Sequence, residues 1–153
     1  MKSSDKDLVA SIRAWVDDWG AEVAAVDFAA GRRRFADDAT AFGTKADVVH
    51  GAEQIAAQQW EHVWGTIDGF TFLTDQLVVH HDHDHPGAIA VAIVPWSSVG
   101  FHVDGTPFDR PGRATIVLRS VTATGDGPQW RAIHTHFSLA LDTPSRSFGS
   151  PNR

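Results

Sequence analysis

The spacing of apolar residues changes about halfway along the chain and predicts helices first and strands afterwards. In residues 5–30, apolar side chains recur mostly at steps of three and four, which is the period of one helical face. Residues 51–64 show the same spacing and predict a second helix that ends at Gly65. The later apolar runs are rich in Val, Ile, Thr, Phe and Trp, as strands are. They cover residues 70–80, 88–101, 113–124 and 129–141.

The connections between these elements favour an α+β fold. Residues 32–38 are expected to form a short turn of helix and residues 39–42 a short strand, ahead of the second helix. Turn-forming residues at 85–87, 104–107 and 125–128 join the later strands at hairpin length. Such connections predict an antiparallel sheet, one face of which the helices must cover. We expect one domain over residues 5–142 and a flexible tail over residues 143–153, where Pro, Gly and Ser are frequent.

The composition excludes several classes of protein. A chain of 153 residues with 42% hydrophobic and 21% charged residues has the size and composition of one globular domain. The net charge is −6 and the basic run Arg32-Arg33-Arg34 lies beside acidic residues, so no nucleic-acid partner is expected. Cysteine is absent, which excludes disulfides and thiolate chemistry. The polar N-terminus and the lack of a long apolar stretch predict a cytoplasmic protein without a signal peptide or membrane span.

Two histidines in the last predicted strand are the first candidates for chemistry. Strict alternation places five residues on one face of that strand: Trp130, Ala132, His134, His136 and Ser138. If this face lines a cavity, His134 and His136 can exchange a proton near neutral pH or, when charged, hold an anion. The alternative is that both are hydrogen-bonded structural residues at the sheet surface or at a dimer interface. On the preceding strand, Arg113 either pairs with an anionic ligand in the same cavity or is solvated at the strand end.

A tract of four histidines and two aspartates, residues 80–85, is the most unusual local feature of the chain. These side chains offer ligands that suit zinc, nickel or copper. The tract precedes Pro86-Gly87 at a hairpin tip, which favours a solvated loop or adventitious metal binding over a preformed centre. We therefore assign no metal to the expected site. Metal-dependent chemistry at this loop is a separate hypothesis that predicts stoichiometric zinc. Glycine loops for phosphates, dinucleotide fingerprints and nucleophile elbows are absent, so no cofactor is expected either.

The tryptophans are candidates for an apolar wall. Trp15 with Trp19, and Trp60 with Trp64, are spaced four residues apart on the predicted helices, so each pair can pack in the core or line a pocket. Trp96 follows Pro95 at an expected strand bend and is placed at the pocket rim. The ligand-contacting residues expected from the sequence are Arg113, Trp64, Trp96 and Trp130.

The closing pair of strands resembles a known family. One strand begins Gly112-Arg113-Ala-Thr115 and the next runs from Trp130 through His134 and His136 to Ser138. With the upstream order from Phe35 to Gly51, residues 8–140 resemble the SnoaL-like branch of the nuclear transport factor 2 superfamily. The chain is also similar to the association domain of calcium/calmodulin-dependent kinase II. This resemblance implies a cone of curved antiparallel sheet closed by N-terminal helices, known as a cystatin-like α+β barrel. It also implies a pocket at the wide end and, commonly, a homodimer through the outer sheet face.

The resemblance does not specify an activity, because the superfamily contains ketosteroid isomerases, polyketide cyclases, epoxide hydrolases, dehydratases and non-enzymatic domains. Isomerase relatives use a carboxylate for proton transfer and an acidic donor for the enolate. This chain has no tyrosine, and Asp75 in the 70–80 run is the best-placed acid or base, followed by Asp38 and Asp27. Two hypotheses follow. The chain is either an isomerase, cyclase, lyase or dehydratase for a small, largely apolar molecule with a carbonyl or acidic group, or a non-catalytic ligand-binding or dimerisation module.

Overall fold

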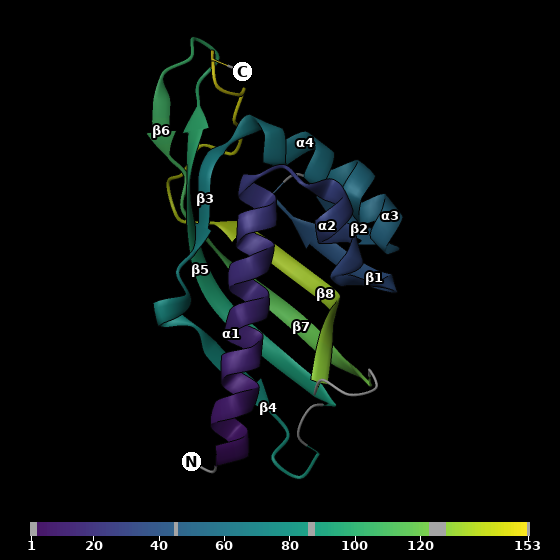
Figure 1. Ribbon diagram of the computed structural model, residues 1–153. Helices are drawn as coiled ribbons and strands as arrows, with labels where there is room; N and C mark the ends of the chain where they lie inside the picture. Colours follow the sequence, from purple (N-terminus) through teal and green to yellow (C-terminus); the bar gives the residue numbers. More distant parts are fainter. Residues whose placement is uncertain (1–2, 45, 86–87, 123–127, 153) are drawn as a thin grey trace.

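In the computed structural model, which describes residues 3–44, 46–85, 88–122 and 128–152, a curved sheet wraps around one long helix (Figure 1). Helix α1 spans Ser3–Ala24 and buries the face that the periodicity predicts: Leu8, Ile12, Trp15, Val16, Trp19 and Val23. The predicted helix over residues 5–30 is wrong at its end. Val26 adopts a positive φ of 56°, and helix α2, Phe28–Arg33, begins after Asp27. The Asp27 carboxylate caps α2 by accepting a hydrogen bond from the Ala30 amide at 3.0 Å.

The second predicted helix is present as a continuous helical segment that changes from α-helix to π-helix, back to α-helix and then to a 3₁₀ turn. It consists of α3 (Ala52–Ile55), the π-helical η1 (Ala56–Trp60), α4 (Glu61–Val63) and the 3₁₀ turn η2 (Trp64–Thr66). π-Helical turns are rare and often occur at functional sites. This one ends with Trp60, and the 3₁₀ turn η2 begins with Trp64; both side chains are buried.

Among the described residues, eight strands form one sheet, with the order β2-β1-β8-β7-β5-β3 and with β4 and β6 also paired to β5. Their bounds are β1 Phe35–Gly43, β2 Ala46–His50, β3 Asp68–Phe72, β4 Val78–His81, β5 Ile89–Phe101, β6 Pro107–Asp109, β7 Gly112–Thr122 and β8 Pro128–Leu139. The α+β class is confirmed, but the sheet is mixed, because β1 and β8 pair in parallel. These two strands are separated by most of the chain, so no hairpin forces them to be antiparallel.

The predicted strand over residues 70–80 is interrupted. It divides into β3 and β4, with the 3₁₀ turn η3 (Thr74–Gln76) between them. The turn is held to α1, because the Thr74 hydroxyl donates to the Asp17 carboxylate at 2.7 Å. Of the predicted turns, the one at residues 104–107 is present but begins earlier, at residues 102–106, with Gly105 at a φ of 88°. Pro86, Gly87 and residues 125–127 of the other two lie outside the described residues.

The core lies between α1 and the concave face of the sheet. Trp19 is at its centre, with ring contacts to Trp15, Phe35, Trp60, Phe72 and Phe137. The C-terminal segment beyond β8 forms no helix or strand among its described residues, but Ser147 is buried there. Its hydroxyl accepts from the Phe101 amide at 2.9 Å and donates to the Thr66 carbonyl, which ties this segment to β5 and η2. None of the described helices has the length and apolar character that a membrane crossing requires.

Candidate functional site

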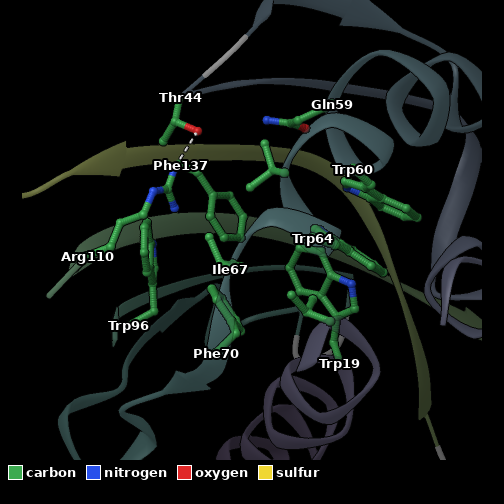
Figure 2. Close-up of a pocket in the computed structure, with 12 residues that line it drawn as sticks. Trp19, Thr44, Gln59, Trp60, Trp64, Ile67, Phe70, Trp96, Arg110 and Phe137 are labelled. Atoms are coloured by element: carbon green, nitrogen blue, oxygen red, sulfur yellow. Dashed lines mark hydrogen bonds between the residues drawn. The ribbon is translucent and has the colours of Figure 1, made fainter. Parts of the chain in front are cut away.

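A pocket opens between the C-terminal half of α1, the helical segment 52–66 and the concave face of the sheet (Figure 2). The space in it that a water-sized sphere can reach is about 40 Å³, which holds only a small number of water molecules, so a larger ligand would have to displace lining side chains. Its lining is mostly aromatic and aliphatic: Trp19, Val23, Thr44, Gln59, Trp60, Val63, Trp64, Ile67, Phe70, Trp96, Arg110 and Phe137.

One wall is a stack of aromatic rings. Trp60 and Trp64 lie nearly parallel, with ring centroids 4.6 Å apart and an interplanar angle of 17°. Phe28 stacks behind Trp64 at 5.4 Å. Gly31 of α2 makes room for this stack, since a Cβ atom there would lie 2.7 Å from Cη2 of Trp64. The rings cover much of one another's faces, so this wall gives the pocket an apolar, tightly packed boundary.

The π-helical turn positions the first polar group of the pocket. Gln59, near the end of η1, is buried, with only 7% of its surface exposed. Its amide lies over Gly43 of β1, where any side chain would collide with the amide nitrogen. In Figure 2, the Gln59 amide and Thr44 lie on the same side of the pocket as the guanidinium of Arg110.

Arg110 is the only charged side chain among the described lining residues. It lies between β6 and β7, and its backbone is fixed to Ser98 of β5. The Arg110 amide donates to the Ser98 carbonyl, and the Ser98 hydroxyl donates to the Arg110 carbonyl at 2.7 Å. Gly100 leaves space for the side chain, because a Cβ atom there would lie 3.1 Å from Cδ of Arg110. The arginine is thereby directed inward and is only 2% exposed.

The guanidinium of Arg110 has few partners. It lies over the Trp96 ring, 5.7 Å from the centroid, and its Nη2 donates to the Thr44 hydroxyl at 3.3 Å. Its Nε is buried without a hydrogen-bond partner, and in the described part of the chain no carboxylate forms an ion pair with it. Burial lowers the pKa of Arg110, although an arginine remains protonated in a protein.

The pocket thus offers hydrogen-bond donors rather than proton acceptors. Two lining tryptophans, Trp19 and Trp96, also have buried ring N–H groups without a partner in the described chain. No aspartate, glutamate or histidine occurs among the described lining residues. Buried donors that lack acceptors carry a desolvation cost, which a ligand with acceptor oxygens would remove.

The sequence predicted that His134 and His136 share a face of β8 with Trp130 and Ala132. This prediction is wrong, because β8 contains a bulge. Ala132 pairs with Leu118 and His134 pairs with Val117, so Ile133 has no partner on β7. An extra residue reverses the alternation beyond it. Trp130 and Ala132 before the bulge are buried, and so is Thr135 after it, whereas His136 is exposed. His134 and His136 therefore lie on the outer face of the sheet and outside the pocket.

The outer face gives both histidines aromatic and hydroxyl neighbours. Nδ1 of His134 is 2.8 Å from the Thr40 hydroxyl, and the His136 ring lies 4.3 Å from that of Phe42. Desolvation lowers the pKa of His134, with a smaller contribution from the nearby His136. Arg113 is exposed on this same face, where its Nε donates to the Ser138 hydroxyl at 2.8 Å. The structure brings these residues together, but away from the pocket.

The remaining predicted residues divide between the pocket and other places. Trp64 and Trp96 line the pocket. Trp130 does not; its ring N–H donates to the Ser11 hydroxyl at 3.0 Å. Asp75 is exposed in η3 rather than in a strand, because Leu73 turns the chain there. Sequence reasoning missed Arg110 and Gln59, and no sequence signal separates Arg110 from the exposed Arg113 nearby.

Comparisons with known proteins agree with this architecture. The model of a family described as the SnoaL-like domain matches residues 12–142. A nuclear transport factor 2-like superfamily protein from Salmonella enterica serovar Typhimurium has a TM-score of 0.72 at 21% identity, covering 92% of this chain and 96% of the other. A ketosteroid isomerase-like protein from Erwinia carotovora atroseptica has a TM-score of 0.67 at 16% identity, covering 89% and 97%.

A third similar structure is a candidate calcium/calmodulin-dependent protein kinase II association domain from Xanthomonas campestris. Its TM-score is 0.65 at 20% identity, covering 86% of this chain and 87% of the other. At these identities the three structures establish the fold alone. A search of curated proteins finds no match. The resemblance predicted from the closing strands is confirmed at the level of family and fold.

Proposed function

We propose that this chain, which belongs to the SnoaL-like domain family, binds a small, largely apolar molecule through an anionic group that Arg110 holds. The observation that supports this most directly is the buried guanidinium with no carboxylate partner in the described chain. A carboxylate on the ligand would supply the missing partner. The stacked Trp60 and Trp64 rings would contact its apolar body.

Electrostatics favours an anion over a neutral group at this position. A charge that is buried without a counterion costs several kcal/mol after relaxation. A carboxylate would offset that cost, because guanidinium and carboxylate can form two parallel hydrogen bonds. The Gln59 amide, on the same side of the pocket, can donate a further hydrogen bond.

The same donors would stabilise an enolate, which is the second candidate role for the pocket. Proton transfer also requires an acceptor, and the described lining residues include no carboxylate or imidazole. Asp75 is exposed in η3, and the outward histidines lie across the sheet. Binding without proton transfer is therefore the function we favour.

Paired probes test binding. 2-Naphthoate and its neutral analogue 2-naphthamide have similar size and shape, so isothermal titration calorimetry of both isolates the contribution of the charge. We expect naphthoate to bind at least about tenfold more tightly, since hydrogen bonds to charged groups contribute about 1.5–3 kcal/mol. Equal affinities, or no binding of either probe, would contradict the proposal.

Hydrogen exchange tests the catalytic alternative. A pocket that forms enolates accelerates exchange of the α-protons of 2-tetralone with deuterium in D₂O, which NMR measures directly. We expect no acceleration by this protein. Acceleration that Arg110→Met removes would instead establish enolate stabilisation in the pocket.

For assembly, we propose a homodimer through the outer face of the sheet, as is common in this family. One row of paired residues crosses that face from β4 to β1: Val78, Ile93, Thr115, His136 and Phe42. Val78 and Ile93 are 47% and 41% exposed, and such neighbouring apolar side chains often mark an interface.

Analytical ultracentrifugation of the wild type and of two aspartate variants tests the dimer. Ile93→Asp is expected to give a monomer, because an unpaired charge would be placed in the interface. Val103→Asp, in the β5–β6 turn where the side chain is 80% exposed, is the matched control and should remain a dimer. A wild-type monomer at concentrations of about 50 µM would overturn this assignment, since a stable interface associates well below that.

A further inference from the structure

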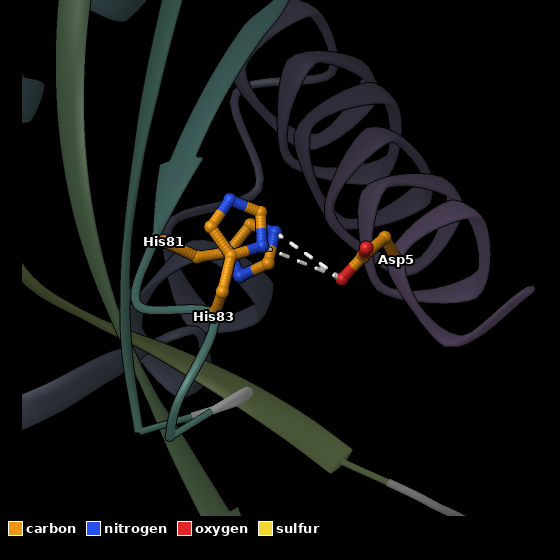
Figure 3. A group of neighbouring side chains, drawn as sticks. All are labelled: Asp5, His81 and His83. Atoms are coloured by element: carbon orange, nitrogen blue, oxygen red, sulfur yellow. Dashed lines mark ion pairs between the residues drawn. The ribbon is translucent and has the colours of Figure 1, made fainter. Parts of the chain in front are cut away.

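A second cluster of chemically active side chains lies at the other end of α1, far from the pocket (Figure 3). Asp5 in the first turn of α1 faces two histidines of the tract 80–85, which begins within β4. Strand alternation sorts that tract: Val79 and His81 face α1 and the core, while Val78 and His80 face outward. His83 follows in the loop, and its ring lies 4.5 Å from that of His81.

The three side chains converge on one point. Oδ1 of Asp5 is 3.7 Å from Nε2 of His81 and 3.9 Å from Nδ1 of His83, and all three ligand atoms lie within 4.8 Å of one another. These separations are too long for direct hydrogen bonds. Ligands of a tetrahedral zinc ion with bonds near 2.0–2.1 Å are separated by about 3.3 Å. The separations would therefore have to shorten by about 0.4 Å to at most about 1.5 Å to close the set around an ion.

The surroundings of His81 also point to a ligand. Its side chain is only 6% exposed, and Nδ1 is buried with no partner among the described residues. The ring therefore obtains no direct hydrogen bond at Nδ1, and its Nε2 faces a carboxylate oxygen across a gap. A cation between them would bind Nε2 and the Asp5 oxygen, while Nδ1 would keep its proton, as a neutral imidazole bound through Nε2 does. Asp5 is 17% exposed and His83 is 78% exposed, which leaves an open side for a water molecule as a fourth ligand.

We propose that Asp5, His81 and His83 form a binding site for a divalent transition-metal ion of the zinc type. Two imidazole nitrogens and one carboxylate oxygen are donors that Zn²⁺ accepts in tetrahedral sites. Asp5 distinguishes this site from a merely histidine-rich loop, because it is contributed by a helix 76 residues earlier in the chain. A bound ion would cross-link the first turn of α1 to the connection between β4 and β5, and so stabilise the fold.

Calorimetric titration with Zn²⁺ tests the site on untagged protein that has been dialysed against a chelator. We expect one ion per chain, with an increase in melting temperature that EDTA reverses. Co²⁺ in place of zinc should show the intense visible absorption of tetrahedral cobalt. Asp5→Asn and His83→Gln are each expected to weaken zinc binding by at least about tenfold.

Matched controls separate the site from adventitious binding by the tract. Asp7→Asn removes an exposed carboxylate two residues after Asp5 in α1. His80→Gln removes the outward-facing imidazole next to His81 in β4. Both should bind zinc as the wild type does. If Asp5→Asn leaves the affinity unchanged, or if His80→Gln weakens it as much as His83→Gln, the proposal is wrong. Far-UV circular dichroism checks that each variant folds. Three of the four substituted residues, Asp7, His80 and His83, are exposed, and Asp5 is partly buried.

Discussion

Replacing Arg110 by methionine should change stability and ligand binding in opposite directions. Methionine has a similar length but no charge, so Arg110→Met removes the cost of burying an unpaired cation. Replacement of buried ion pairs by apolar side chains adds about 1–4 kcal/mol of stability. The variant also loses the hydrogen bond to Thr44, about 1 kcal/mol, and the contact with the Trp96 ring, about 1 kcal/mol. These figures leave a net change between about −1 and +2 kcal/mol, and its midpoint is a gain of about 0.5 kcal/mol, or roughly 1–2 °C in melting temperature.

Binding of an anion should weaken in the same variant. Loss of a charge-assisted hydrogen bond costs about 1.5–3 kcal/mol, which is roughly a 10- to 150-fold increase in the Kd for 2-naphthoate. The Kd for 2-naphthamide should change little, since the amide has no charge to lose. Urea unfolding measures the first effect and isothermal titration calorimetry the second. Arg110→Lys should be intermediate in binding, because lysine keeps the charge without the planar fork.

Arg113→Met is the matched control for Arg110→Met. Arg113 is exposed on the outer face, so its loss should change the free energy of unfolding by no more than about 0.5 kcal/mol. Its loss should also leave the Kd for naphthoate unchanged. The reasoning fails if Arg110→Met lowers stability and still binds naphthoate as tightly as the wild type. The guanidinium would then be a structural group.

Two further predictions concern the sheet. Desolvation lowers the pKa of His134 from its ordinary value of 6.5, so on acidification His134 takes up its proton in the unfolded chain before it does in the folded one. The free energy of unfolding should therefore fall as the pH drops below 6.5. Urea unfolding at several pH values measures this slope, which His134→Gln should reduce. Gly112→Ala should cost about 1–3 kcal/mol, since its Cβ would collide with the Trp96 ring and the Ser138 carbonyl. Gly65→Ala, which meets no atom within 4 Å, is the matched control and should be neutral or slightly stabilising in the same unfolding assay.

Hydrophobic spacing predicted the main elements because burial determines them. The buried face of α1 and the long strands β5, β7 and β8 follow directly from periods of about 3.6 and 2 residues. Three features depend on tertiary contacts and have no such period. They are the break at Val26, the turn at Leu73 and the parallel pairing of β1 with β8.

The candidate site was harder to predict than the fold, for two physical reasons. A single residue of β8 without a partner on β7, Ile133, reverses which side chains face the core. The sequence of β8 alone does not show this bulge, because a bulge is defined by the pairing with β7. Arg110 is directed inward by backbone hydrogen bonds to Ser98 and by the space above Gly100, both of which come from a different strand. Arg113, three residues later, has the same side chain and points to solvent.

Helix α1 connects the pocket and the proposed metal site. The pocket is expected to lower the free energy of unfolding, and a bound metal ion is expected to raise it. Trp19 near its C-terminal end lines a pocket that contains an unpaired cation, whereas Asp5 in its first turn would bind a stabilising ion. Fourteen residues separate them, which is about 21 Å along the helix axis. Between them, the Trp15 ring N–H donates to the Trp130 carbonyl at 3.1 Å and fixes the helix to β8. An ion at Asp5 would therefore raise the free energy of unfolding of the whole domain and so offset the cost of burying Arg110. The pocket itself would not have to change its structure.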